Sequence, residues 1–230
     1  MKLLLFDIDQ TLINTGGAGL RALNRACEKI LDLRNAMDGI SPHGKTDPAI
    51  AREILRARFG SGSPADHEIS SILEGYLSFL AEEVQSSPTY RVLPGILSLL
   101  EEMSPRKDVM LGLATGNIEL GARVKLSRAN LNRYFEFGGF GSDSEDRTEL
   151  VRRAAERASR KSDVSISPSN VFVIGDTPLD IQAGNQAGFK TVGVATGSYS
   201  VDQLLEAGAM IAVTDLSDGR NHFLRSTFIE

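Results

Sequence analysis

The chain has 230 residues, 41% of them hydrophobic, and a formal net charge of −5. This length accommodates one large domain or two modest ones with a sizeable core. The negative charge argues against a nucleic acid or an anionic membrane surface as partner, because both favour a basic face. Cys27 is the only cysteine, which excludes a disulfide within the chain and a cysteine-based metal site.

The first residues give no sign of targeting or of a membrane anchor. The chain enters an apolar segment without the basic lead and cleavage site of a signal peptide, and no later apolar stretch is long enough to span a bilayer. We therefore expect a soluble, cytoplasmic protein with no membrane partner. Cys27 lies at helical spacing from Leu23 and Ile30, so we interpret it as a core residue rather than a nucleophile.

Four apolar segments have the composition of buried strands, and each ends in polar residues. Residues 3–6 run directly into Asp7 and Asp9, and the later segments span 109–114, 171–175 and 191–195. Apolar strands without alternation are typical of a parallel sheet covered on both faces. Because the carboxyl ends of parallel strands share one edge, these polar residues are expected to meet there.

Residues 15–88 differ from the rest of the chain because they contain only helical patterns. Leu20 and Leu23 begin a helical face, Asp47-Pro48 reads as an N-cap followed by proline at the first helical position, and a third helix follows the loop at 60–64. From residue 89 strands and helices alternate again, as in a doubly wound sheet. We predict an α/β core of residues 1–14 and 89–230 with a helical cap of residues 15–88, which would exclude water and select substrates.

The residues expected at the sheet edge suggest phosphoryl transfer. Asp7 and Asp176 would repel each other and a phosphate, and Mg2+ removes that repulsion because it binds carboxylates and phosphate oxygens. The segment 115–117 is expected to cradle an anion where a helix begins, and Thr177-Pro178 would place Asp180 in a first helical turn as a supporting residue. Asp7 would then be the nucleophile, and Asp9 would protonate the leaving oxygen and later activate water.

Three motifs carry a resemblance to the haloacid dehalogenase-like hydrolase superfamily: residues 7–11, 115–117 and 175–180. The helical insertion, its loop at 44–47 and the return at 93–95 resemble the phosphoglycolate-phosphatase-like branch. The resemblance implies a Mg2+-dependent phosphatase acting on a small phosphate ester such as 2-phosphoglycolate or a sugar phosphate. It also implies metal binding by the carboxylates of Asp7 and Asp176 and by the backbone carbonyl of Asp9, and phosphate binding by Thr115, Gly116 and Asn117.

Two positions depart from the family pattern. Gln10 stands where the family usually has glycine, so the flap after the site is expected to differ or Gln10 to face the substrate. No lysine-proline pair occurs for the third motif, and Arg147 is the best replacement, able to hold phosphate in bidentate fashion. The alternative is that Arg147 is a solvated residue paired with Asp143 or Glu145. Lys125 and Lys161 are weaker candidates.

Residues of the cap loop are the candidates for substrate selection. Lys45, beside Thr46, would meet a substrate carboxylate, with a plain surface lysine as an equal alternative. His43 lies nearby, and we assign no role to His67 or His222. Rival functions are a phosphomutase, a phosphonatase or a dehalogenase on the same fold, and a non-catalytic phospho-acceptor module. Neither the substrate nor the oligomeric state follows from these residues.

Overall fold

A six-stranded sheet forms the centre of the molecule in the computed structural model, which describes residues 1–60 and 65–217. Its order is β5-β4-β1-β6-β7-β8 and all its strand pairs are parallel. This arrangement confirms the predicted α/β fold class. The strands are β1 (Lys2–Phe6), β4 (Val109–Thr115), β5 (Gly138–Phe140), β6 (Val171–Gly175), β7 (Lys190–Val194) and β8 (Ile211–Val213).

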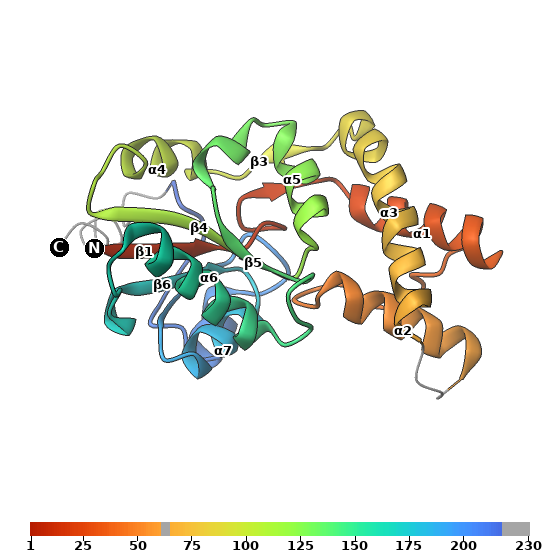
Figure 1. The fold of residues 1–230 in the computed structure, drawn as a ribbon. Coiled ribbons are helices and arrows are strands. Elements are labelled where there is room, and N and C mark those ends of the chain that lie inside the picture. Colours follow the sequence, from red (N-terminus) through yellow and green to blue (C-terminus); the bar gives the residue numbers. More distant parts are fainter. Residues whose placement is uncertain (61–64, 218–230) are drawn as a thin grey trace.

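Strand β1 shows why its sequence is apolar throughout. Leu4 and Phe6 point into a core on one face of the sheet, and Leu3 and Leu5 into a second core on the other. Figure 1 shows α4 and α5 over one face and α6 and α7 over the other. The core helices are α4 (Ile96–Met103), α5 (Glu119–Ser127), α6 (Arg147–Ser162), α7 (Pro178–Gln186) and α8 (Val201–Glu206), with short 3-10 turns η1 (Leu131–Tyr134) and η2 (Pro168–Asn170).

Three helices form a separate layer beyond the carboxyl ends of β1 and β4 (Figure 1). They are α1 (Ala18–Leu31), α2 (Asp47–Phe59) and α3 (Asp66–Ser86), and they lie in the chain between the antiparallel pair β2 (Ile13–Asn14) and β3 (Arg91–Val92). The cap, as we call residues 15–88, has its own hydrophobic cluster. The exact boundaries at 14 and 89 stay a prediction. Residues 61–64 of the predicted loop and residues 218–230, with His222, lie outside the described residues.

The cap helices differ in two details from the sequence-based expectation. Thr46, not Asp47, is the N-cap of α2, and its hydroxyl accepts a hydrogen bond from the Ala49 N–H. The helical face expected from Leu20 is buried only in part. Leu23 and Cys27 are buried, together with the small residues of α1 that pack against α3, whereas Leu20 is 43% exposed. The prediction that Cys27 is a core residue is confirmed.

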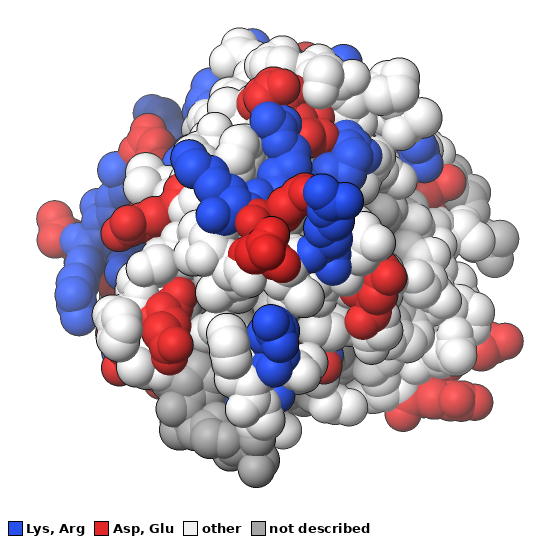
Figure 2. Space-filling model, turned by 90° about the vertical axis from the view of Figure 1, so that its right-hand side faces the viewer, with Lys and Arg blue, Asp and Glu red and all other residues white. Residues whose placement is uncertain are grey.

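The outer surface of the cap carries charges of both signs. Figure 2 shows basic and acidic side chains interspersed at this end of the molecule. Arg25, for example, pairs with Glu82 at 3.0 Å and Glu83 at 2.8 Å. Among the described residues, no helix combines the length and apolar character needed to cross a membrane.

Candidate active site

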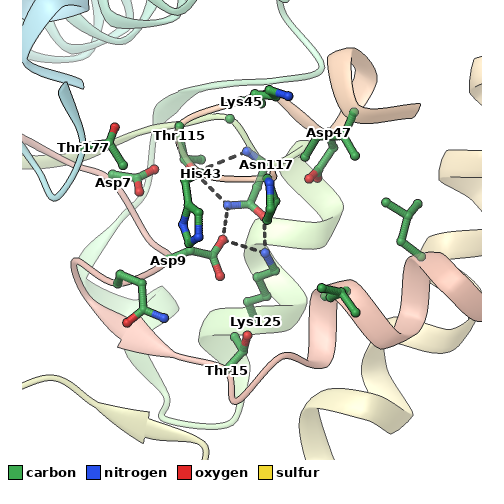
Figure 3. A pocket seen from close by; sticks show the side chains of 18 of the residues that line it. Asp7, Asp9, Thr15, His43, Lys45, Asp47, Thr115, Asn117, Lys125 and Thr177 are labelled. Carbon is green, nitrogen blue, oxygen red and sulfur yellow. Dashed lines mark hydrogen bonds and ion pairs between the residues drawn. The ribbon is translucent and has the colours of Figure 1, made fainter. Parts of the chain in front are cut away.

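The ends of three neighbouring strands converge on one cavity. Asp7 follows β1, Thr115 ends β4 and Asp176 follows β6, and all three line a cavity of about 330 Å³ between the sheet edge and the cap. Figure 3 shows Asp7 and Thr115 on the core side of this cavity, with Lys45 on the overlying cap loop. The structure thus brings together the strand-end residues predicted to meet at the edge of the sheet.

A group of three buried carboxylates lies at the floor of the cavity. Oxygen atoms of Asp7, Asp176 and Asp180 fall within 4.8 Å of one another. Burial, followed by the charge of Asp180, raises the pKa of Asp7 to about 7 and that of Asp176 to about 9. These carboxylates hold their protons unusually tightly because ionising them together in a buried place is unfavourable. This is the donor set that a hard divalent cation favours.

Asp180 is held by its own helix terminus. As predicted, Thr177 is the N-cap of α7 with Pro178 at the first helical position, and the N–H and hydroxyl of Thr177 donate to Asp180 at 3.0 and 2.6 Å. Because these bonds occupy one oxygen of Asp180, its carboxylate is fixed beside Asp176. The geometry is compatible with the supporting role predicted for Asp180.

Arg147 is the first residue of α6 and points into the same cluster. Its guanidinium forms an ion pair with Asp180 and lies 3.6 Å from Asp7. Only 12% of its side chain is exposed. Burial opposes the charged form, but the neighbouring Asp180 and Asp7 raise the pKa of Arg147 above its usual range.

The alternative partners considered for Arg147 are engaged elsewhere. Asp143 forms a bidentate ion pair with Arg157, and Glu145 pairs with Arg52 at 2.8 Å. The alternative of a solvated Arg147 is therefore wrong. Lys161 lies apart from the cavity lining and pairs with Glu136 at 2.5 Å.

Asp9 stands apart from the carboxylate cluster and has a different set of partners. Its Oδ2 atom accepts hydrogen bonds from Asn117 Nδ2 at 2.9 Å and from Lys125 Nζ at 2.6 Å. Lys125 also donates to Asn117 Oδ1 at 2.5 Å, so the three side chains close a triangle (Figure 3). Lys125, the weaker candidate for the third motif, thus lies inside the site.

Lys125 is buried where the cap meets the core. Although burial opposes its charge, Asp9, Tyr76 and Asp47 raise the pKa of Lys125 above its usual range. Tyr76 and Asp47 belong to the cap helices α3 and α2. Sequence spacing could not reveal this grouping, since the three elements come together only through tertiary packing.

The loop of residues 115–117 is closed by its own side chains and by the cap. The Thr115 hydroxyl accepts hydrogen bonds from the backbone N–H and the side-chain amide of Asn117. Helix α5 begins only at Glu119, and the N–H of Ile118 donates to Asp47 at 2.9 Å. Within the predicted cradle of residues 115–117, the N–H of Asn117 is therefore not free, and the N–H of Ile118, just beyond the cradle, is occupied by a cap carboxylate.

The cap loop approaches the core closely at Gly116. A Cβ atom there would collide with the backbone carbonyl of Lys45, and the N–H of Asp47 donates to the Gly116 carbonyl at 2.8 Å. Only glycine allows this approach. Thr46 is buried and caps α2, whereas Lys45 and His43 line the cavity.

The flap after β1 keeps the backbone that glycine would favour. Gln10 has a φ of 60°, and its carbonyl accepts a hydrogen bond from the Thr196 hydroxyl. Of the two outcomes expected for Gln10, a position facing the substrate agrees with its place in the cavity lining, and the expected difference of the flap from the family stays a prediction.

Comparison with known proteins agrees with this geometry. A family model described as haloacid dehalogenase-like hydrolase matches residues 4–194. The chain belongs to this family. The assignment confirms the predicted superfamily and the expectation of a hydrolase.

Individual members resemble the chain over most of its length. The Phosphorylated carbohydrates phosphatase of Thermotoga maritima is 25% identical over 224 residues, which cover 93% of this chain and 94% of the relative. The Phosphoglycolate phosphatase of Aquifex aeolicus is 24% identical over 83% of each chain. A hydrolase structure from Pseudomonas syringae superimposes with a TM-score of 0.74 at 22% identity, covering 98% of this chain and 99% of that one. This last likeness supports the haloacid dehalogenase-like fold with its helical cap.

Proposed function

We propose that the chain is a Mg2+-dependent phosphatase that hydrolyses a small phosphate ester through a phosphorylated Asp7. The observation that carries the proposal is the placement of Asp7 in a buried carboxylate cluster beside Arg147, at the floor of a cavity that the cap covers. A phosphatase of small phosphorylated molecules also agrees with the family and with the names of the two phosphatases that resemble the chain.

The carboxylates fit the predicted metal. Asp7 and Asp176 would bind Mg2+ through their side chains and Asp9 through its backbone carbonyl, with Asp180 in support. When bound, Mg2+ would neutralise the crowded negative charge and polarise the phosphoryl oxygens. The raised pKa values of Asp7 and Asp176 support this assignment, because they record how unfavourable the cluster is without a cation.

The phosphoryl group is assigned to Arg147 and to the loop of Thr115, Gly116 and Asn117. The Arg147 guanidinium supplies positive charge next to the nucleophile, and the side chains of Thr115 and Asn117 provide further polar contacts at the end of the neighbouring strand β4. In the first step, an Asp7 oxygen bonds to phosphorus while the bond from phosphorus to the leaving oxygen breaks. Asp9 donates its proton to that oxygen.

The second step releases phosphate and restores the enzyme. Asp9 takes a proton from a water molecule as that water attacks phosphorus and the bond from Asp7 to phosphorus breaks. The division of roles follows from the surroundings of the two carboxylates. Asp7 is buried with the metal ligands, whereas the Asp9 side chain is 39% exposed and oriented by Lys125.

The rival reactions receive less support from the described contacts. A phosphonatase would need a cap lysine with a free amine, and Lys45 instead pairs with Glu53 at 2.5 Å. The candidate substrates remain small esters, among them 2-phosphoglycolate and sugar phosphates.

The test is a phosphate-release screen over small phosphorylated compounds, with and without Mg2+, run beside the variant Asp7→Asn. We expect release that requires Mg2+ and that Asp7→Asn abolishes. If the variant Asp7→Asn still released phosphate, Asp7 would not be the nucleophile. A stable phosphoprotein without turnover would favour the phospho-acceptor module instead.

A further inference from the structure

The cavity has two chemically different walls. Its core wall carries the carboxylates, Arg147 and the polar loop of residues 115–117. Its cap wall is mostly apolar and includes Leu20, Leu23, Met37, Ile50, Leu73 and Tyr76, beside the polar residues Thr15, His43, Lys45 and Asp47. A volume of about 330 Å³ is at the small end for ligand sites, so a compact substrate would contact both walls at once.

The lysine and arginine side chains that line the cavity are already paired. Lys45 pairs with Glu53 at 2.5 Å, Lys125 with Asp9 at 2.6 Å, and Arg147 with Asp180. A carboxylate or a second phosphate on the substrate would have to share a cation whose charge an aspartate or glutamate already balances. An uncharged group needs no such cation.

The apolar wall also disfavours a group rich in hydroxyls. A hydroxyl placed against Leu23, Met37 or Ile50 would lose its hydrogen bonds to water without gaining new ones, which is unfavourable. An alkyl chain in the same place would leave water and contact apolar side chains instead. Leu20 is part of this wall although 43% of it is exposed, which places it where the wall opens to solvent.

Resting on the phosphatase function proposed above, we propose that the alcohol part of the substrate is uncharged and largely apolar, such as a short alkyl chain. Leu20 is then a specificity-determining residue at the mouth of its subsite. An uncharged, apolar alcohol part means that 2-phosphoglycolate and sugar phosphates are not the preferred substrates.

The first test measures kcat/KM with Mg2+ for ethyl, butyl and hexyl phosphate beside 2-phosphoglycolate and glucose 6-phosphate. The alkyl esters differ little in leaving-group chemistry, so their differences report binding of the chain. We expect kcat/KM to rise by about fourfold for each methylene that enters the subsite. Equal values along the alkyl series, or a preference for either of the two polar esters, would overturn the inference.

The second test changes one residue of the cap wall and leaves the carboxylates and Arg147 unchanged. Leu20→Lys adds an unpaired cation to the apolar subsite, so the ratio of kcat/KM for hexyl phosphate to that for 2-phosphoglycolate should fall on the order of tenfold or more. Leu97→Lys is the matched control, since Leu97 lies on α4, is 42% exposed and is not part of the cavity lining. An unchanged ratio in Leu20→Lys would contradict the assignment of Leu20.

The two proposals fail in different ways. If no phosphate ester is hydrolysed under any condition, the phosphatase function itself is wrong, and the inference falls with it. If hydrolysis requires Mg2+ and Asp7 but 2-phosphoglycolate or the sugar phosphate is preferred, the phosphatase function stands and only the apolar subsite is wrong.

Discussion

The Nζ atom of Lys125 lies 2.6 Å from Oδ2 of Asp9, although the two residues are 116 positions apart. Lys125 is buried in α5 of the core and reaches Asp9, also a core residue, at the place where the cap covers the core. A cation fixed at this distance orients the carboxylate proposed to protonate the leaving group. Lys125 is therefore expected to act on catalysis through Asp9 rather than through the substrate.

The variant Lys125→Met removes this cation and keeps a side chain of similar length. Proton donation contributes on the order of 10²-fold or more, so kcat/KM for an alkyl phosphate should fall by about that factor. Esters of acidic phenols should lose much less, because their leaving groups need no proton. Lys161→Met, which removes a surface lysine paired with Glu136, serves as control. Equal losses for both kinds of ester would indicate a purely structural Lys125.

Arg147 is expected to stabilise the charge that develops on the phosphoryl group. Arg147→Ala should lower kcat/KM by about 10²- to 10³-fold, and Arg147→Lys should recover only part of it because lysine lacks the bidentate geometry. Steady-state kinetics beside Arg153→Ala provides the check, since Arg153 is an exposed residue of the same helix. If Arg147→Ala had the same kcat/KM as the parent protein, Arg147 would have only a structural role.

Binding of Mg2+ should stabilise the folded protein. Saturating Mg2+, at about a hundred times its Kd, is expected to raise Tm by about 5–10 °C, measured against Na+ at equal ionic strength. The shift should grow between pH 6 and pH 9, because protons compete with the metal for Asp7 and Asp176, whose pKa values are raised to about 7 and about 9. Asp176→Asn should lose most of the shift, and the control Asp202→Asn, at an exposed position in α8, should keep it. An undiminished shift in Asp176→Asn would place the metal elsewhere.

Ionisation of Asp47 should lower the stability of the folded protein as the pH rises. Burial raises its pKa from 3.8 to about 6, so between these values the folded chain binds more protons than the unfolded chain. The contribution of Asp47 to stability is therefore greatest below pH 4 and is lost as the pH rises through about 6.

The variant Asp47→Asn isolates this effect. Asparagine keeps an oxygen that can accept the hydrogen bond from the Ile118 N–H, and it does not ionise. The free energy of unfolding of the variant, relative to the parent, should therefore increase between pH 4 and pH 7, by up to about 3 kcal/mol. Unfolding by denaturant at several pH values in this range measures the free energy of unfolding of both proteins. The other carboxylates ionise in both proteins, so their effect cancels in the difference. A difference that stays constant or decreases with pH would contradict the assignment.

Much of the fold was predictable because buried parallel strands have an unmistakable composition. Leu3, Leu4 and Leu5 are apolar since both faces of β1 are covered. Strands β5 and β8 were not predicted, as each has only three residues. Gly139 in β5 also reads as a loop residue, whereas it is glycine because a Cβ atom would collide with the Leu150 carbonyl.

The candidate site was predictable only where residues follow strand ends. Asp7 and Asp176 could be brought together by the rule that parallel strands end at one edge. The contacts of Lys125 depend on how α5 packs against the cap, and the contact of Asp47 with Ile118 depends on how the cap lies on the core. No local pattern in the sequence encodes either relationship.

The most direct test of the account is chemical trapping of the phosphorylated enzyme. The variant Asp9→Asn, which should slow hydrolysis of the intermediate, is mixed with Mg2+ and the phosphate ester of an acidic phenol, whose leaving group needs no proton from Asp9. The mixture is quenched in acid and analysed by peptide mass spectrometry. The account predicts a phosphoryl group that hydroxylamine removes, on the peptide that contains Asp7, and none in Asp7→Asn. A phosphoryl group on another residue, or one that persists in Asp7→Asn, would contradict it.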